Sequence, residues 1–156
     1  MPEIASDAML TQYAASRGLF AALRLAPGED LISGLRKAQR ESGAQAMSVI
    51  SCAGSLTAVT IRHANQSDGT HYHGHFEITS LTGTIDPRHQ HLHLTIADEN
   101  GRTYGGHLLA GSAVYTTAEI VVLLLTDIRF SREPCPQSGF DELTISKRMP
   151  LGDFTV

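Results

Sequence analysis

The chain has 156 residues, of which 42% are hydrophobic and 18% charged, so it is long enough for one folded domain and too apolar to stay disordered. Its net charge of −4 argues against a bare phosphate-binding surface, because nucleic-acid-binding faces are usually basic. The two cysteines lack Cys-x-x-Cys spacing and indicate neither a disulfide framework nor a cysteine metal site.

The sequence indicates no targeting or membrane segment. Residues 1–16 are mixed and acidic, unlike a secretory signal with a basic start and an apolar centre. The longest apolar run, Ile120 to Leu125, has the length of a buried strand and is too short to span a membrane. We therefore expect a cytoplasmic protein that does not associate with membranes.

A first strand is predicted at Gly18 to Leu25, followed by the one clear helix of the chain. Pro27-Gly28 opens this helix, acidic residues at 29 and 30 lie in its first turn, and Gly43 ends it. Its apolar residues recur at Leu31, Leu35 and Ala38, which gives the helix one apolar face.

Strands dominate the rest of the chain. They are predicted at residues 46–52, 56–63, 71–80, from 82 onward, 91–96, 113–125 and 143–147, with a proline-containing loop at 131–139. This pattern favours an α+β fold with a mostly antiparallel sheet, and no linker divides the chain into two domains.

The segment His91 to Ile96 alternates polar and apolar residues, as a half-buried strand does. Side chains at i and i+2 share one face of a strand, so His91 and His93 point one way and the apolar residues between them point the other. The next histidine, His107, follows a hairpin signal at residues 98–102.

The length of that hairpin loop decides whether His107 joins the other two histidines. A two-residue Asn100-Gly101 turn would place His107 opposite Leu94, on the wrong face. A three-residue loop, residues 99–101 with Gly101 left-handed, would place His107 directly opposite His93. We favour the longer loop, because it needs a glycine at its last position and Gly101 stands there.

Three imidazoles on one face form a metal site or a general-base site. Zn²⁺ binds neutral imidazoles, and a catalytic zinc site leaves a fourth position open to water. The alternative is a set of buried histidines that are hydrogen-bonded inside a subunit interface. Glu77 could orient a metal-bound histidine or act as a base, and Gly105 and Gly106 could host a bulge or admit a ligand or a second backbone.

His71, His73 and His75 form a second alternating set, whose face also includes Glu77. The favoured interpretation is an exposed histidine-rich strand end, with incidental nickel or zinc binding as the alternative. His89 is two residues before His91, so in a continuous strand it would point to the same face and could lie near the first set of histidines.

Several motifs, in the same order and spacing, resemble the Plants and Prokaryotes Conserved (PPC) domain over residues 19–145. These motifs are residues 23–31, 49–56, 76–83, 91–98 and 105–108, followed by Gly111 and Ala118-Glu119. The resemblance implies a central, mostly antiparallel sheet of about seven strands with one main amphipathic helix packed on it, and a homotrimer. We expect an N-terminal extension at 1–17, the PPC-like domain at 18–147 and a C-terminal tail at 148–156.

The histidine triad of the PPC family carries over to His91, His93 and His107, and it implies a bound divalent metal, often taken as zinc. In plants the domain is joined to an AT-hook, a short Arg-Gly-Arg-Pro segment that reads the minor groove. The nearest segment in this chain is Ser16-Arg17-Gly18-Leu19, so the hook is absent and direct DNA binding is not expected.

Three functions stay open at this point. The first is a metal-binding homotrimer with a ligand-binding or regulatory role, which could take a small-molecule ligand. The second is a DNA-associated regulator that acts through partners. The third is a metal-dependent hydrolase or lyase, so the sequence leaves open whether the protein is an enzyme.

Overall fold

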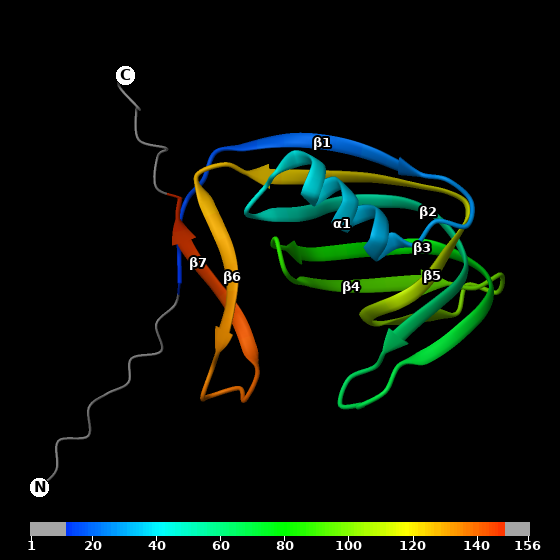
Figure 1. Ribbon diagram of the computed structural model, residues 1–156. Helices are drawn as coiled ribbons and strands as arrows, with labels where there is room; N and C mark the ends of the chain where they lie inside the picture. Colours follow the sequence, from blue (N-terminus) through cyan, green and yellow to red (C-terminus); the bar gives the residue numbers. More distant parts are fainter. Residues whose placement is uncertain (1–11, 149–156) are drawn as a thin grey trace, which may run out of the picture.

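Residues 12–148 are described by the computed structural model, and they form one helix and seven strands (Figure 1). In chain order the elements are β1 (Gly18–Leu25), α1 (Leu31–Ser42), β2 (Met47–Arg62), β3 (Thr70–Ile85), β4 (Gln90–Ala97), β5 (Thr103–Leu125), β6 (Ile128–Pro134) and β7 (Asp141–Lys147). The pairings among these strands are antiparallel, in agreement with the expected α+β class. Most of the predicted N-terminal extension and C-terminal tail lies outside the described residues.

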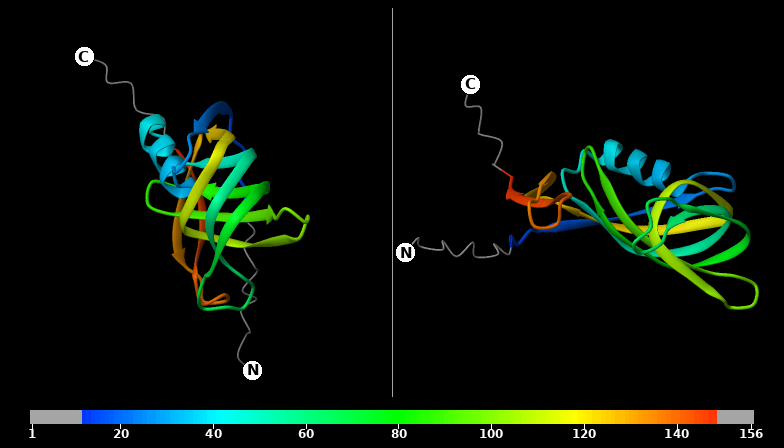
Figure 2. Two further views of the ribbon diagram at one scale, coloured as in Figure 1. Left: turned by 90° about the vertical axis from the view of Figure 1, so that its right-hand side faces the viewer. Right: turned by 90° about the horizontal axis from the view of Figure 1, so that it is seen from below.

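The long strand β5 closes the main sheet on itself. The strand order is β1-β5-β2-β3-β4, and β5 also pairs with β4. Because β5 has 23 residues, its start pairs with β4 and its end with β1, while β2 runs along its other edge. The strands wrap around one another in the left view of Figure 2. The histidine-bearing strand β4 therefore has a partner on each side, β3 and β5.

The seven strands belong to two sheets rather than to the single sheet that the resemblance implied. Five strands form the closed sheet, and β6 and β7 form a separate pair beside it (Figure 1). This pair has its own small core around Ala46, Ile128 and Phe130. The prediction of a loop over residues 131–139 is wrong in its first part, because β6 continues to Pro134. Proline is tolerated there because it lies at the end of a strand in a two-stranded sheet.

Two predicted interruptions of strands are absent. The predicted strands 46–52 and 56–63 are one strand, β2, and those at 71–80 and from 82 onward are one strand, β3. Gly54, between the first two of these predicted strands, lies where β2 approaches β5 so closely that a Cβ would clash with the Thr117 carbonyl. Glycine inside a strand here indicates a close approach of two backbones and not a chain reversal.

Asp30 fixes the start of helix α1. Its Oδ1 accepts the Ser33 N–H at 2.8 Å, as an N-cap does, and its Oδ2 accepts the N–H and the hydroxyl of Ser112 on β5 at 2.9 and 2.8 Å. The helix therefore begins at Leu31, later than the predicted opening at Pro27-Gly28, and the acidic residues 29 and 30 precede its first turn.

The apolar face of α1 packs on the closed sheet, as expected. Leu31 and Leu35 are fully buried, and the left-handed Gly43 caps the C-terminus as predicted. Figure 2 shows the helix lying along one side of the wrapped strands. Within residues 12–148 no helix is long and apolar enough to cross a membrane.

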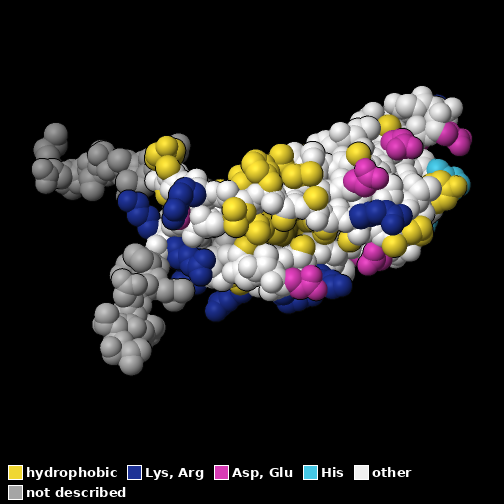
Figure 3. All heavy atoms as spheres, turned by 90° about the horizontal axis from the view of Figure 1, so that it is seen from above, with side chains coloured by type: hydrophobic (Ala, Val, Ile, Leu, Met, Phe, Trp, Pro, Cys, Tyr) yellow, Lys and Arg dark blue, Asp and Glu magenta, His cyan; other side chains and the backbone are white. Residues whose placement is uncertain are grey.

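Hydrophobic side chains gather on the upper face of the molecule, in the view from above (Figure 3). This face includes β1, the edge strand of the sheet, where Leu19 and Phe20 are 63% and 71% exposed. Ile50 on β2 is 48% exposed. Large exposed apolar patches on a folded domain typically mark contact surfaces.

Candidate metal centre

The loop between β4 and β5 has the predicted three-residue form. The Asp98 N–H donates to the Arg102 carbonyl, the Gly101 N–H donates to the Asp98 carbonyl, and Gly101 has a φ of 76°. In the resulting register His93 lies directly opposite His107. The predicted pairing across the hairpin is therefore confirmed.

The three histidines lie at the spacing of metal ligands. The Nε2 atoms of His91 and His93 are 3.2 Å apart, and one ring nitrogen of each histidine lies within 4.8 Å of those of the other two. Two nitrogens bound to one tetrahedral zinc ion at about 2.0–2.1 Å would be about 3.3–3.4 Å apart. Only small side-chain rotations separate the set of His91, His93 and His107, called here the triad, from a metal-binding arrangement.

A buried apolar layer holds the triad at the surface. Leu92, Leu94 and Leu108 alternate with the histidines on the two strands, and each is no more than 2% exposed. His91 and His93 are exposed and His107 is half-buried. The sheet therefore anchors the backbone of the triad while the three rings stay accessible on the surface of the single chain.

The close approach that was expected at Gly105-Gly106 is present at Gly106. A Cβ on this residue would lie 2.5 Å from the carbonyl oxygen of Arg62, so only glycine lets β2 pack this tightly against β5. Arg62 is consequently the direct cross-strand partner of His107.

Helix α1 also helps to place β4. The guanidinium of Arg36 donates to the carbonyls of Asp86 at 2.6 Å, Pro87 at 2.7 Å and His89 at 3.1 Å. These three carbonyls belong to the turn that leads into His91. One side chain of the helix thus holds the turn from which the triad strand begins.

The surroundings of the triad favour neutral imidazoles. Burial, followed by the positive charge of Arg62 and the neighbouring histidines, lowers the pKa of His107 from 6.5 to about 4. Burial and the charge of His93, with a smaller effect of Arg132, also lower the pKa of His91. A metal ion binds the neutral ring, so these two histidines are in the ligand-competent state at neutral pH.

The triad lies between two pockets. One, of about 370 Å³, is lined by His91 and His107 together with Arg62, Arg132, Phe140 and four further residues. The other, of about 680 Å³, adjoins all three histidines and is also lined by Arg62 and by residues 63–67 of the β2–β3 loop. Phe140, in the turn between β6 and β7, borders both pockets. A ligand could therefore reach the triad from either side.

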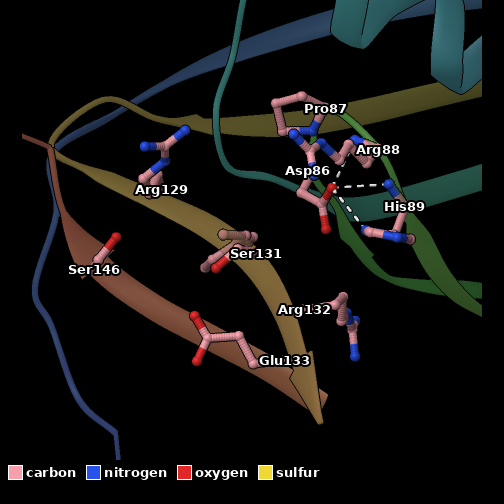
Figure 4. Close-up of a pocket in the computed structure, with 10 residues that line it drawn as sticks. Asp86, Pro87, Arg88, His89, Arg129, Ser131, Arg132, Glu133 and Ser146 are labelled. Atoms are coloured by element: carbon pink, nitrogen blue, oxygen red, sulfur yellow. Dashed lines mark hydrogen bonds and ion pairs between the residues drawn. The ribbon is translucent and has the colours of Figure 1, made fainter. Parts of the chain in front are cut away.

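A third pocket, of about 390 Å³, lies between β6 and the turn before β4 (Figure 4). In that turn the Oδ1 of Asp86 accepts the N–H groups of Arg88 and His89 at 2.7 and 2.8 Å. His89 lines this pocket and also the pocket of about 370 Å³ beside the triad, so it lies near the triad as its spacing from His91 predicted.

Glu77 is not near the triad. It pairs with Ala97 at the far end of β4, four residues from His93, which is about 13 Å along a strand. Its expected role beside the metal is therefore wrong.

The neighbour that the sequence analysis missed is His63, at the end of a predicted strand. Its Nδ1 donates to the Gly105 carbonyl at 3.0 Å, and its Nε2 accepts the Tyr72 hydroxyl at 2.6 Å.

The second set of histidines does not converge. His71 hydrogen-bonds to the Thr60 hydroxyl at 2.8 Å, while the His75 ring packs against Tyr115 with centroids 4.5 Å apart. In the part of the chain that the structure describes, the triad is the one group of three potential ligands. The interpretation of an exposed strand end therefore agrees with the structure.

The closed antiparallel sheet and the three-histidine surface cluster define the class of this protein as a small α+β domain with a candidate metal centre. The chain belongs to the Plants and Prokaryotes Conserved domain family, whose model matches residues 14–126. The resemblance found in the sequence motifs is thereby confirmed, and the match ends just before β6.

A curated relative of this chain is the bifunctional protein GlmU from Synechococcus sp. strain JA-3-3Ab. It is 46% identical over 125 residues, which cover 80% of this chain and 20% of the relative. This chain thus spans about a fifth of the length of that relative.

Two solved structures share the fold. A hypothetical protein from Salmonella enterica is 42% identical with a TM-score of 0.86, covering 88% of this chain and all of its own. A metal-containing protein from Archaeoglobus fulgidus is 25% identical with a TM-score of 0.68, covering 86% of this chain and 98% of its own.

Proposed function

We propose that this protein is a small homotrimeric metal-binding domain, in which His91, His93 and His107 hold one divalent metal ion and present it to a small ligand. The observation that carries the proposal is the convergence of three imidazole nitrogens within 4.8 Å on an accessible face. The metal would supply a Lewis-acidic centre with open coordination positions.

Zinc fits this ligand set best. Imidazole suits zinc, copper, iron and nickel, whereas magnesium and calcium prefer oxygen ligands, and no carboxylate belongs to the cluster. The similarity to a metal-containing protein from Archaeoglobus fulgidus supports the presence of a metal. Three protein ligands leave a fourth tetrahedral position, which is the arrangement of sites that bind a ligand or water rather than of closed structural sites.

The role of a ligand-binding or regulatory module is supported by the relative from Synechococcus, in which the same domain forms about a fifth of a longer bifunctional protein. A hydrolase or lyase would use the same metal with an added proton-transfer group. The two functions differ in one readout, because metal removal would abolish turnover in an enzyme but only ligand binding in a regulatory module.

A DNA-associated role through partners is the weaker candidate. The chain has a net charge of −4, and its closest approach to an AT-hook is the segment Ser16-Arg17-Gly18-Leu19. A salt titration of binding to duplex DNA distinguishes direct binding from a role through partners, since direct phosphate contacts would make the affinity fall steeply with salt. We expect no salt-dependent binding in the isolated protein.

The homotrimer is supported by exposed apolar surface, since hydrophobic side chains gather on the upper face (Figure 3) and Leu19 and Phe20 of the edge strand β1 are exposed. Light scattering coupled to size-exclusion chromatography would measure the number of chains, with Phe20→Glu as the variant. We expect a trimer for the wild type and dissociation in the variant.

The metal site is tested by elemental analysis of untagged protein. We expect about one metal ion per chain in the wild type and its loss in His93→Ala. His73→Ala is the matched control, because it removes an exposed histidine of the neighbouring strand β3 that lies outside the triad. Absence of metal from the wild type, or retention in His93→Ala, would disprove the metal site.

A further inference from the structure

Two arginines flank the triad from different parts of the fold. Arg62 on β2 is the cross-strand partner of His107. Arg132 comes from β6, in the separate two-stranded sheet, and its Nη2 donates to the Thr84 hydroxyl at 3.2 Å. Thr84 is in turn the partner of His91 on β4. Each arginine thus lies next to one histidine of the triad, and the Arg132 guanidinium is held there by Thr84.

Neither arginine forms an ion pair within residues 12–148. Among residues 12–148 the ion pairs are Arg17–Asp127, Lys37–Glu41 and His89–Asp86, none of which includes Arg62 or Arg132. Both arginines are half-buried and line the pocket of about 370 Å³ that also contains His91 and His107. Partly buried cations without a partner in a pocket favour an anionic ligand.

The ligand set of the metal increases this preference. Three neutral imidazoles leave the full charge of a divalent ion uncompensated, since no carboxylate belongs to the cluster. An anion beside Arg62 and Arg132 would offset part of this combined positive charge. Arginine pairs with the two oxygens of a carboxylate in a bidentate geometry, which adds direction to the attraction.

The rest of the pocket limits the size and charge of this anion. Asp141 and Glu142 line it from β7 and offset the charges of the two arginines, which weakens the attraction for a phosphate dianion relative to a monoanion. Phe140, which is 74% exposed, offers an apolar surface at the mouth of the same pocket. A volume of about 370 Å³ is at the lower end of the range for small-molecule sites.

We propose that this pocket binds a small organic monocarboxylate, with Arg62 and Arg132 holding its oxygens beside the triad and Phe140 contacting its apolar body. This inference rests on the proposed metal site for its full affinity. The arginine pair itself belongs to the protein without metal, so the two ideas can be tested separately.

The test titrates benzoate, inorganic phosphate and uncharged benzamide into the zinc-loaded protein and into the metal-free protein at neutral pH, with binding followed by calorimetry. The variants are Arg62→Gln, Arg132→Gln and the matched control Arg102→Gln, an exposed arginine at the β4–β5 loop. Metal content is measured for every sample, so a loss of metal is distinguished from a loss of the carboxylate site.

We expect benzoate to bind the zinc-loaded wild type more tightly than phosphate does and benzamide not to bind. Each of Arg62→Gln and Arg132→Gln should weaken benzoate binding roughly tenfold or more at unchanged metal content, because each removes a charge-assisted hydrogen bond. Arg102→Gln should bind benzoate like the wild type.

Three results would overturn the inference: equal binding of benzoate by the wild type and both pocket variants, tighter binding of phosphate than of benzoate, or binding of benzamide as tight as that of benzoate. If the protein takes up no metal, the proposed function fails. The carboxylate site then stands only if benzoate binds the metal-free wild type and both pocket variants lose this binding.

Discussion

His93 and His107 are directly paired residues on the two arms of one β-hairpin, although a turn and the adjoining ends of two strands separate them in sequence. Their pairing depends on the loop at residues 99–101, since a loop shorter by one residue with the same strands would place Leu94 opposite His107. The convergence of the triad is therefore a consequence of hairpin register, and the residue that sets this register, Gly101, is not itself a member of the triad.

Replacement of Gly101 by alanine should destabilise the fold by about 1–2 kcal/mol, because its φ of 76° is unfavourable for a residue with a Cβ. No atom lies near enough to clash with the new methyl group, so the cost is purely conformational. Urea unfolding would measure it, with the adjacent Asn100→Ala as the control that should change stability little. Equal stabilities of the two variants would argue against the left-handed loop.

Metal loading should stabilise the wild type and not His93→Ala. A ligand that binds only the folded state at a hundred times its Kd adds about 2.7 kcal/mol to the free energy of unfolding. Thermal unfolding of chelator-treated protein with and without added zinc would show this as a raised Tm. His73→Ala should respond like the wild type, and a similar rise in His93→Ala would place the metal elsewhere.

Acid should weaken the metal-free protein between about pH 6.5 and pH 4. The unfolded chain binds a proton at His107 near pH 6.5, whereas the folded chain, in which the pKa of His107 is about 4, does not until lower pH. Unfolding therefore takes up a proton within this range, and stability falls as pH is lowered and levels off below the folded pKa. Allowing for the partial exposure of the ring, we expect a loss of about 1–2 kcal/mol.

Urea unfolding at several pH values in the presence of a chelator would measure this loss. His107→Gln removes the titrating ring, so its stability should depend less on pH over the same range. If the free energy of unfolding depended on pH equally in both proteins, groups other than His107 would be responsible for the loss of stability in acid.

Asp30 should contribute more to stability than an ordinary helix cap. Its carboxylate accepts hydrogen bonds from Ser33 and from both the N–H and the hydroxyl of Ser112, so it joins α1 to β5. Asp30→Ala should cost about 2 kcal/mol or more, since it removes the cap and leaves part-buried donors unpaired.

Ser33→Ala is the control for Asp30→Ala, because the cap bond uses the backbone N–H of Ser33 and survives this change. Urea unfolding of the two variants would compare them. Similar stabilities of the two variants would show that the Asp30 carboxylate contributes no more to stability than an ordinary surface side chain.

The sequence predicted the structure best where a short-range pattern of residues determines the local backbone. Alternation in residues 91–96 predicted the strand and the face of His91 and His93, and the glycine at the end of the hairpin loop predicted the register that adds His107. The helix was predicted from its apolar spacing, and only its start was misplaced, because Asp30 serves as a cap.

The strand prediction was wrong at a glycine, because glycine occurs both in turns and where two strands approach each other closely. Gly54 lies between two segments that were predicted as separate strands, but in the structure it permits a close contact between two long strands. A turn and a close approach of strands cannot be told apart in the sequence, since both favour a residue without a Cβ.

By itself the sequence determined the fold class, the helix, the histidine strand and the three members of the triad, because these follow from short-range periodicity and loop chemistry. The tertiary structure decided which residues surround the triad. Arg62 reaches it through the pairing of β2 with β5, and Arg132 reaches it from a sheet of its own. Glu77 is excluded by the register of β3 against β4. Such contacts depend on how distant strands pair and pack, which no local pattern specifies.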